Sequence, residues 1–392
     1  MLVLGRSVVV ALVPTRDGDD TEAVDGVPRE PCPVVEAGLP ERGPGHAGTR
    51  LIVGIDEAGY GPRLGPLCVA ACGLVVPASV DPGEPVWALL APVVARSRAG
   101  VDELTVPIAD SKQLKLASDT VRRHPLVFLE RGVLTWARLT IDAEIDDDAS
   151  LIGHLGAGEG LFSVPSEHRA HRCPWYAGEP APMPIAHTHD QLAVIRARLS
   201  RALDHAHLRP AGLWCEAASE AVFNAMVAEL GPKSRVAFRL VGRLLRRAWA
   251  MTPSGSGGAP TLVVVDRQGG RTKYASALAG ALPDTAIETL DESGEVSAYL
   301  VRDPPGDDRA MRIEFRVRAE SSSLPVALAS MTAKFVRELA MLRFNRWWSA
   351  KVEGLKPTAG YATDAGRWLG DVSAALGGHF DDGTRAHLVR RA

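Results

Sequence analysis

A strand-like apolar run in this sequence ends in two adjacent acids and then in a turn rich in glycine. The segment is LIVGIDEAGYGPRLGP, residues 51–66, and its acids are Asp56 and Glu57. Gly59 and Gly61 let the backbone turn tightly and approach a ligand closely. Neighbouring strand residues point to opposite faces, so both carboxylates can serve one site only if the strand already turns at Glu57. The segment predicts either a metal site or a capped turn with two solvated acids.

Further acids stand at the ends of predicted strands or turns. Asp110 lies in ADSKQL, Asp266 closes TLVVVD, and Glu320 closes IEFRVRAE. In open α/β sheets the carboxyl ends of the strands line a crevice, so acids far apart in the sequence can converge there. Converging carboxylates repel one another unless cations lie between them, and oxygen ligands favour Mg²⁺ or Mn²⁺. Two such ions about 4 Å apart stabilise the attacking and leaving oxygens of a phosphodiester, so the pattern predicts phosphoryl hydrolysis.

The elements that would position these acids alternate between strand and helix. Apolar runs and alternation predict strands at residues 51–55, 67–76, 126–130, 261–266, 286–290 and 312–319. Helical spacing predicts helices at residues 191–207, 217–230, 234–251 and 324–349. This interleaving predicts an α/β fold.

The chain divides into three parts by composition. Residues 1–50 are mostly rich in Gly, Pro and acids without periodicity, and are predicted to be a disordered or weakly ordered leader. Residues 51–117 and 261–392 are predicted to form one catalytic domain. Residues 118–260 are predicted to be an insertion with helices and a loop bearing Pro and His, and the flexible stretch PSGSGGAP marks its end.

Composition sets the protein class. The 392 residues are 46% hydrophobic and 23% charged, which is ordinary for a globular protein with a sizeable core. A net charge of −3 gives no global sign of nucleic-acid binding, so any such binding must rest on a local basic patch. The five scattered cysteines favour a reducing cytoplasm over a disulfide framework. No stretch has the apolar length of a membrane span, so a cytoplasmic protein without membrane contact is expected.

The opening motif resembles that of a known enzyme family. GIDEAGYGPRLGP is similar to the GIDEAGRGPLAGP signature of ribonucleases HII and HIII, which have the ribonuclease H fold. The segments ADSKQL, TLVVVD, SMTAKFVRE and GYATDAGRWL resemble further family segments and occur in the family's order. The resemblance covers residues 51–115 and 261–377. It implies a ribonuclease H-like mixed sheet flanked by helices, with a large, mainly helical insertion between the two parts.

The resemblance also implies a reaction. Asp56, Glu57, Asp266 and Glu320 would be the catalytic residues and would hold two Mg²⁺ or Mn²⁺ ions. The enzyme would hydrolyse the RNA strand of RNA–DNA hybrids, or ribonucleotides embedded in duplex DNA, and leave 5′-phosphate and 3′-hydroxyl ends. Glu320 stands where the family usually has Asp. The alternative is a catalytically impaired nucleic-acid-binding protein on the same scaffold.

The resemblance implies a set of substrate-binding residues as well. They are Gly59, Tyr60, Gly61, Arg63, Lys112 and Tyr361. The two glycines would present backbone amides to a ribose 2′-hydroxyl, which distinguishes RNA from DNA. Tyr60 stands where the family has a phosphate-pairing Arg or Lys and would stack or hydrogen-bond instead, while Arg63 would replace the charge. Lys112 would contact a phosphate, and Tyr361 would pack beside the ribonucleotide junction.

Three other patterns have simpler alternatives. Arginines recur every four residues from Arg235 to Arg247, which predicts either a surface that tracks nucleic acid or a solvated helix face paired with local acids. The histidines and cysteine at positions 168, 171, 173, 187 and 189 fit no standard zinc spacing, so a loop bearing histidines is favoured. The glycine spacing after Glu57 also occurs in dinucleotide-binding turns, but Pro62 and a strand-like run follow where a helix should begin.

Overall fold

The computed structural model describes residues 48–80, 86–117, 123–162, 173–254, 259–304, 308–377, 385 and 387–391. The described residues all belong to one compact unit, His46–Ala392. The predicted leader, residues 1–50, lies outside the described residues except for its last three positions. No described helix is long and apolar enough to cross a membrane.

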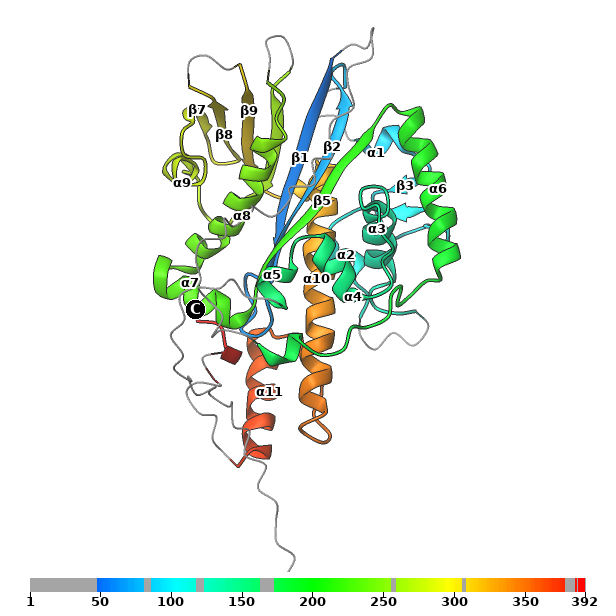
Figure 1. The fold of residues 1–392 in the computed structure, drawn as a ribbon, viewed down its shortest axis with the longest axis vertical. Coiled ribbons are helices and arrows are strands. Elements are labelled where there is room, and N and C mark those ends of the chain that lie inside the picture. Colours follow the sequence, from blue (N-terminus) through cyan, green and yellow to red (C-terminus); the bar gives the residue numbers. More distant parts are fainter. Residues whose placement is uncertain are drawn as a thin grey trace, which may run out of the picture. The chain divides into compact units, whose positions relative to one another are not determined.

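The centre of the unit is a mixed seven-stranded sheet (Figure 1). Its strand order is β5-β2-β1-β6-β9-β8-β7. The strands are β1 (Thr49–Ala58), β2 (Leu67–Pro77), β5 (Arg209–Ala218), β6 (Thr261–Asp266), β7 (Ala286–Glu292), β8 (Val296–Arg302) and β9 (Ala310–Arg316). β1, β6 and β9 are parallel, and the other neighbours pair antiparallel. A separate parallel pair is formed by β3 (Val94–Ala95) and β4 (Val106–Pro107).

Helices cover both faces of the sheet. One face packs against α10 (Leu324–Ser349), with α3 (Val127–Ala137), α6 (His189–His205) and α11 (Ala362–Ala375) beyond it. The other face packs against α7 (Glu220–Leu230), α8 (Lys233–Ala250) and α9 (Ala275–Ala281). The shorter helices are α1 (Val86–Leu89), α2 (Ser111–Leu114), α4 (Asp148–His154), α5 (Gly158–Leu161), η2 (Pro174–Tyr176) and η3 (Ala319–Ser321). The predicted α/β class, a mixed sheet flanked by helices, is confirmed.

The period of two along β1 explains why one strand contributes to both cores. Ile52 packs in the cluster beneath α10, whereas Val53 and Ile55 pack in the cluster beneath α8. Successive side chains of a strand point to opposite faces, so an uninterrupted apolar run fits a strand that is covered on both sides.

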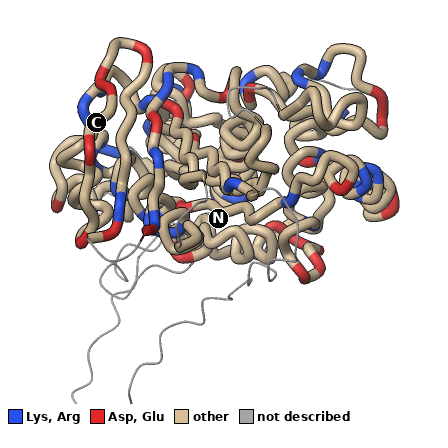
Figure 2. The backbone as a smooth tube through the Cα atoms, turned by 90° about the horizontal axis from the view of Figure 1, so that it is seen from above, with Lys and Arg blue, Asp and Glu red and all other residues tan. Residues whose placement is uncertain are grey.

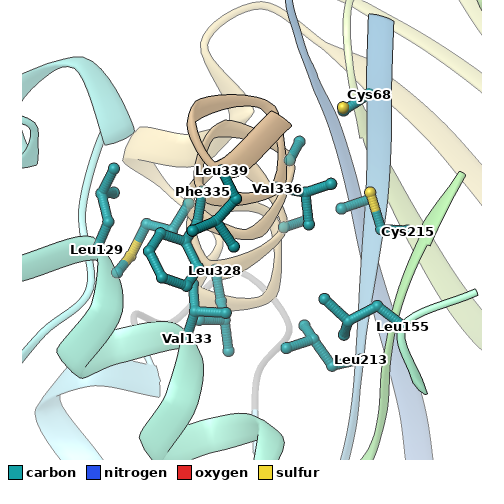
Figure 3. Packing of buried hydrophobic residues seen from close by; sticks show 14 of the residues in the cluster. Cys68, Leu129, Val133, Leu155, Leu213, Cys215, Leu328, Phe335, Val336 and Leu339 are labelled. Atoms are coloured by element: carbon teal, nitrogen blue, oxygen red, sulfur yellow. The ribbon is translucent and has the colours of Figure 1, made fainter. Parts of the chain in front are cut away.

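α10 is the central helix of the larger core. Leu328 and Phe335 on α10 lie against Leu129 and Val133 of α3, and the sheet residue Leu213 lies across from them (Figure 3). Most residues of α10 are buried on every side of the helix. A helix that is buried on every side is surrounded by protein, which fits the place of α10 between the sheet and α3.

The first turn of α10 lies directly against β1 at Gly54. A Cβ atom added to Gly54 would lie 2.1 Å from the backbone nitrogen of Val326 and 2.2 Å from the carbonyl carbon of Pro325. Only glycine allows this approach. The contact fixes where the rest of α10, including Ser330, lies relative to the end of β1.

Several elements of the structure differ from those that the sequence patterns predicted. Residues 126–130, predicted as a strand, belong to the start of α3, since a short apolar run cannot by itself distinguish a strand from a buried helix. β5 and β8 were not predicted. β5 contains Pro210 and Gly212, which weaken a strand pattern, and it is held by pairing with β2.

The interval 118–260 is integrated with the rest of the sheet. It supplies the edge strand β5 and the helices α7 and α8, which cover one sheet face. Whether the interval is an insertion relative to other proteins stays a prediction. In this chain it completes the sheet and contributes residues to both cores.

Candidate active site

Asp56 and Glu57 lie at the carboxyl end of β1, and the strand continues past both. Asp56 pairs with Ala70 and Glu57 with Val69 on β2, so the strand does not yet turn at Glu57. The strand alternation therefore separates the two side chains. Asp56 lies on the α10 side, where the Ser330 hydroxyl is beside its carboxyl group. Glu57 lies on the α8 side.

Asp266 and Glu320 come to the same edge from the two neighbouring parallel strands. Asp266 is the last residue of β6, which pairs with β1 up to Ile55 and Val265. Its Oδ1 accepts a hydrogen bond of 2.8 Å from the backbone N–H of Ala319. Glu320 is in η3 after β9, and its charge adds to the rise in the pKa of Asp266, so its carboxyl group lies near the Asp266 side chain. The four predicted acids thus interact at one edge of the sheet.

The mutual repulsion of these acids appears in their pKa values. Burial, followed by the charges of Asp266 and Glu57, raises the pKa of Asp56 well above its ordinary value. Burial and the charge of Asp266 raise the pKa of Glu57 to about 7. Burial raises the pKa of Asp266 to about 6, and the neighbouring Glu320 adds to this. Lys112 opposes the shifts of Glu57 and Asp266, so its ammonium group lies near both.

The chemistry of this donor set fits a hard divalent cation, but the ligand geometry is not preformed. Burial and mutual repulsion raise the pKa values of these carboxylates, and a bound cation would lower them again. In the part of the chain that the structure describes, no three His, Cys, Asp or Glu side chains are placed to hold one ion together. The opposite orientations of Asp56 and Glu57 on β1 account for this spacing.

The glycine turn after Glu57 rests on two buried arginines. Gly59 and Gly65 have left-handed φ angles of 89° and 85°. Arg337 of α10 donates hydrogen bonds to the carbonyls of Leu64, at 3.1 Å, and Ala359, at 2.9 Å. A Cβ on Gly59 would lie 2.7 Å from Nε of Arg337, so the turn and the arginine fit only with glycine.

Arg390, near the end of the chain, holds the other side of the turn. Its guanidinium donates to the carbonyls of Gly59 and Pro62, and its backbone N–H donates to Arg63 at 2.9 Å. Burial lowers the pKa of Arg390 to about 10, and the charge of Arg337 adds to this. Sequence reasoning missed Arg390, because no motif connects two positions 331 residues apart.

The predicted substrate-binding residues have different degrees of exposure around this turn. Gly61 and Arg63 are exposed, and the backbone N–H of Arg63 donates to Gly360 at 2.8 Å. That contact brings Tyr361, which is 48% exposed, beside the turn. Tyr60 is half-buried, and Lys112 is exposed near the acids. Their substrate-binding roles stay predictions.

Several of the other polar residues have local structural roles instead. Asp110 caps α2 by accepting from the backbone N–H of Lys112 at 2.9 Å. On α8, Arg239 pairs with Glu229 at 3.2 Å, and Arg243 pairs with Glu216 at 3.1 Å. These two arginines fit the alternative of a helix face paired with local acids.

The loop that carries histidines gives no metal site within the described residues. His187 bonds to Glu130 at 2.8 Å, and the Sγ–H of Cys173 donates to the His387 carbonyl at 3.7 Å. Positions 168 and 171 lie outside the described residues. Four cysteines lie in the described part, and all four are buried free thiols.

Comparison with known proteins gives structural neighbours only. No family model and no curated protein matches the sequence. Ribonuclease HII of Archaeoglobus fulgidus, solved in a complex with PCNA, is 13% identical with a TM-score of 0.36, over 87% of this chain and 93% of that chain. Ribonuclease H2 of Pyrococcus horikoshii OT3 is 14% identical with a TM-score of 0.35, over 86% and 96%. Bst-RNase HIII, in complex with Mn²⁺, is 13% identical with a TM-score of 0.34, over 88% and 67%. The structural neighbours are ribonucleases of types HII and HIII.

The raised pKa of Glu57 leads to a prediction for the metal-free protein. The folded-state pKa is about 7 against 4.5 for the free side chain, so the folded state holds the proton more tightly. Protonated Glu57 therefore contributes to the stability of the folded state. This contribution is complete below pH 4.5 and is lost as the pH rises through about 7. The loss is on the order of 3 kcal/mol. Thermal unfolding in EDTA should therefore show a lower Tm at pH 8 than at pH 5.5, and Mg²⁺ should raise the Tm mainly at pH 8.

The matched variant for this experiment is Glu57→Gln. It removes the ionisable group but keeps the shape of the side chain, so the fall in Tm between pH 5.5 and pH 8 should become smaller. A Tm that falls equally in both proteins would contradict the assignment of this pH dependence to Glu57.

Proposed function

We propose that this protein is an endonuclease of the ribonuclease H type that depends on divalent metal ions. The observation that carries the proposal is the interaction of Asp56, Glu57, Asp266 and Glu320 at the carboxyl edge of three parallel strands. Each of the first three has a raised pKa in the absence of a cation. Burial and mutual repulsion make these acids costly to ionise in the metal-free protein, and bound divalent cations would offset that cost.

The four acids would hold one or two Mg²⁺ or Mn²⁺ ions. Such ions, when bound, activate a water molecule and stabilise charge on the leaving oxygen of a phosphodiester. The Ala319 N–H orients Asp266, and Ser330 orients Asp56.

The substrate would be an RNA–DNA hybrid or duplex DNA that contains a ribonucleotide. Gly59 and Gly61 lie directly after the acids, where their backbone amides could contact a ribose 2′-hydroxyl. Arg337 and Arg390 donate hydrogen bonds to carbonyl groups of this turn, which would keep its amides in place. Tyr361 and Lys112 flank the turn and the acids. A cytoplasmic location belongs to the same proposal and follows from the cysteine pattern.

The test is a cleavage assay with four labelled duplexes. RNA–DNA hybrid, DNA with one embedded ribonucleotide, plain DNA and plain RNA are incubated with Mg²⁺ or Mn²⁺. Cleavage of the first two, with 3′-hydroxyl and 5′-phosphate products, is expected from the natural sequence. Asp266→Asn should abolish it, because Asp266 interacts with the acids of both neighbouring strands. Asp204→Asn, on the exposed face of α6, is the matched control and should cleave normally.

A binding protein on the same scaffold is the second candidate. The observation that favours it is that no three ligands are preformed for one ion among the described residues. The two candidates differ in one result. A binding protein would retain the hybrid in a mobility-shift assay yet leave every duplex intact with either metal, and that outcome would refute the nuclease proposal.

A further inference from the structure

Two cations lie beside Tyr60 on the α8 side of the acid cluster. Nζ of Lys233, the first residue of α8, is 5.1 Å from the centre of the Tyr60 ring. The charge of Arg271 lowers the pKa of Tyr60, against a larger rise from burial, so the guanidinium lies near that hydroxyl. Arg271 follows β6 and Asp266 in the chain. The charge of Glu57 adds to the rise in the pKa of Tyr60, so the Glu57 carboxylate also lies near this ring.

Aromatic rings hold the two cations in place. The Arg271 guanidinium lies 5.5 Å from the ring centre of Phe238 and 5.6 Å from that of Tyr274. Tyr274 is in turn stacked on Phe315 at 3.6 Å. Lys233 and Arg271 are both half-buried. Side chains that pack on rings lose less entropy when they bind a ligand.

Neither cation is neutralised within the described part of the chain. Lys233 and Arg271 make no ion pair there within 4.0 Å, whereas Arg239 and Arg243 on the same α8 helix are paired with acids. Figure 2 shows that basic and acidic positions are interleaved over the unit. Lys233 and Arg271 therefore do not belong to a face of the unit that is basic throughout. Half-buried positive charges without partners favour an anionic ligand.

Gln268 gives an independent observation at the same place. The residue is only 6% exposed and its side chain lies beside Glu57. Its amide nitrogen and oxygen make no hydrogen bond of standard geometry with the described residues. A hydrogen bond from Gln268 lowers the pKa of Glu57, so the amide is within reach of that carboxylate and the rest of its hydrogen-bonding capacity is unused. A ligand that accepts a hydrogen bond would use this capacity.

We propose that Lys233, Arg271 and Gln268, together with the Tyr60 hydroxyl, bind a phosphate of the nucleic-acid backbone beside the acid cluster. The acids alone would repel a nucleic-acid strand, and the two cations offset this repulsion on the Glu57 side. Arg271 offers several N–H donors, Lys233 a compact charge, and Gln268 one amide donor. The identity of the ligand as nucleic acid rests on the proposed nuclease function.

The experiment measures binding without cleavage. The parent protein carries Asp56→Asn, and fluorescence anisotropy follows its binding to a labelled RNA–DNA hybrid between about 50 and 200 mM salt. Lys233→Gln and Arg271→Gln should each weaken binding about fivefold at the lower salt concentration. The double variant should reduce the slope of log K against log salt by about two.

Two matched variants separate this role from a structural one. Lys233→Arg keeps the charge and should bind like the parent. Arg239→Gln removes a paired cation from the same helix and should leave the salt slope unchanged. When inorganic phosphate alone is titrated into the parent and into Lys233→Gln, neither protein should show saturable phosphate binding.

The outcomes are distinct. Equal slopes for the parent and the double variant, or an equal loss with Arg239→Gln, would overturn the phosphate site. Saturable binding of inorganic phosphate through Lys233 would show that the site does not require a nucleic-acid strand and would overturn that assignment. A parent protein that binds no hybrid would overturn it as well. A natural sequence that binds hybrid through Lys233 and Arg271 but never cleaves it would refute the proposed nuclease and leave the phosphate site intact.

Discussion

Asp56→Asn should abolish hybrid cleavage and at the same time make the metal-free protein more stable. Asp56 is 8% exposed, and burial together with Asp266 and Glu57 raises its pKa. The ionised carboxylate is therefore destabilising at neutral pH, and a neutral amide removes that cost. In the proposed nuclease Asp56 is a metal ligand, and its loss should remove several kcal/mol of transition-state stabilisation and lower kcat by about a thousandfold or more.

Two measurements on the same samples check this prediction. Single-turnover cleavage of the hybrid gives the rate, and thermal unfolding in EDTA at pH 8 gives the Tm. The exposed Asp204→Asn on α6 should change neither quantity. A variant that loses activity and also loses stability would show that Asp56 is structural, and a variant with normal activity would remove it from the site.

Gly54→Ala should have the largest effect on stability. The added Cβ would lie 2.1 Å from the Val326 nitrogen and 2.2 Å from the Pro325 carbonyl carbon, and both are backbone atoms that cannot rotate away. β1 and α10 must therefore separate, which disturbs the larger core along its length. We expect a loss of about 3 kcal/mol or more in the free energy of unfolding, or a chain that does not fold.

Gly61→Ala is the matched control, because the same substitution meets no atom within 4 Å there. Its free energy of unfolding should stay within about 0.5 kcal/mol of the natural sequence. Urea denaturation followed by circular dichroism measures both variants. If Gly54→Ala unfolds at the same urea concentration as Gly61→Ala, the close approach of α10 to β1 is not as the structure has it.

Gly54 also connects the fold to the site. The first turn of α10 touches Gly54, and Ser330 further along the helix lies beside Asp56. A partly folded Gly54→Ala protein should therefore lose activity through displacement of Ser330 and Asp56, although neither residue is changed.

The sequence by itself determined which acids meet. Asp56 and Asp266 each end a β-branched apolar run, and such runs form strands because they are covered on both faces. Parallel strands place their carboxyl ends at one edge, so the convergence of these acids follows from local pattern alone. The helices with clear apolar spacing were likewise predicted to within a few residues, because their buried residues recur at helical spacing within one continuous segment.

The tertiary structure decided the rest, because it depends on contacts between distant parts of the chain. Residues 127–130 lie in α3 and not in a strand, and this helix packs its apolar side chains in the core around α10. Pairing of β1 with β2 continues through Glu57, so Asp56 and Glu57 face opposite sides of the sheet. Arg390 supports the glycine turn, and Lys233 lies over Tyr60, across separations that no local pattern records. The sequence thus determined which carboxylates converge, whereas long-range packing decided how they are oriented and which cations surround them.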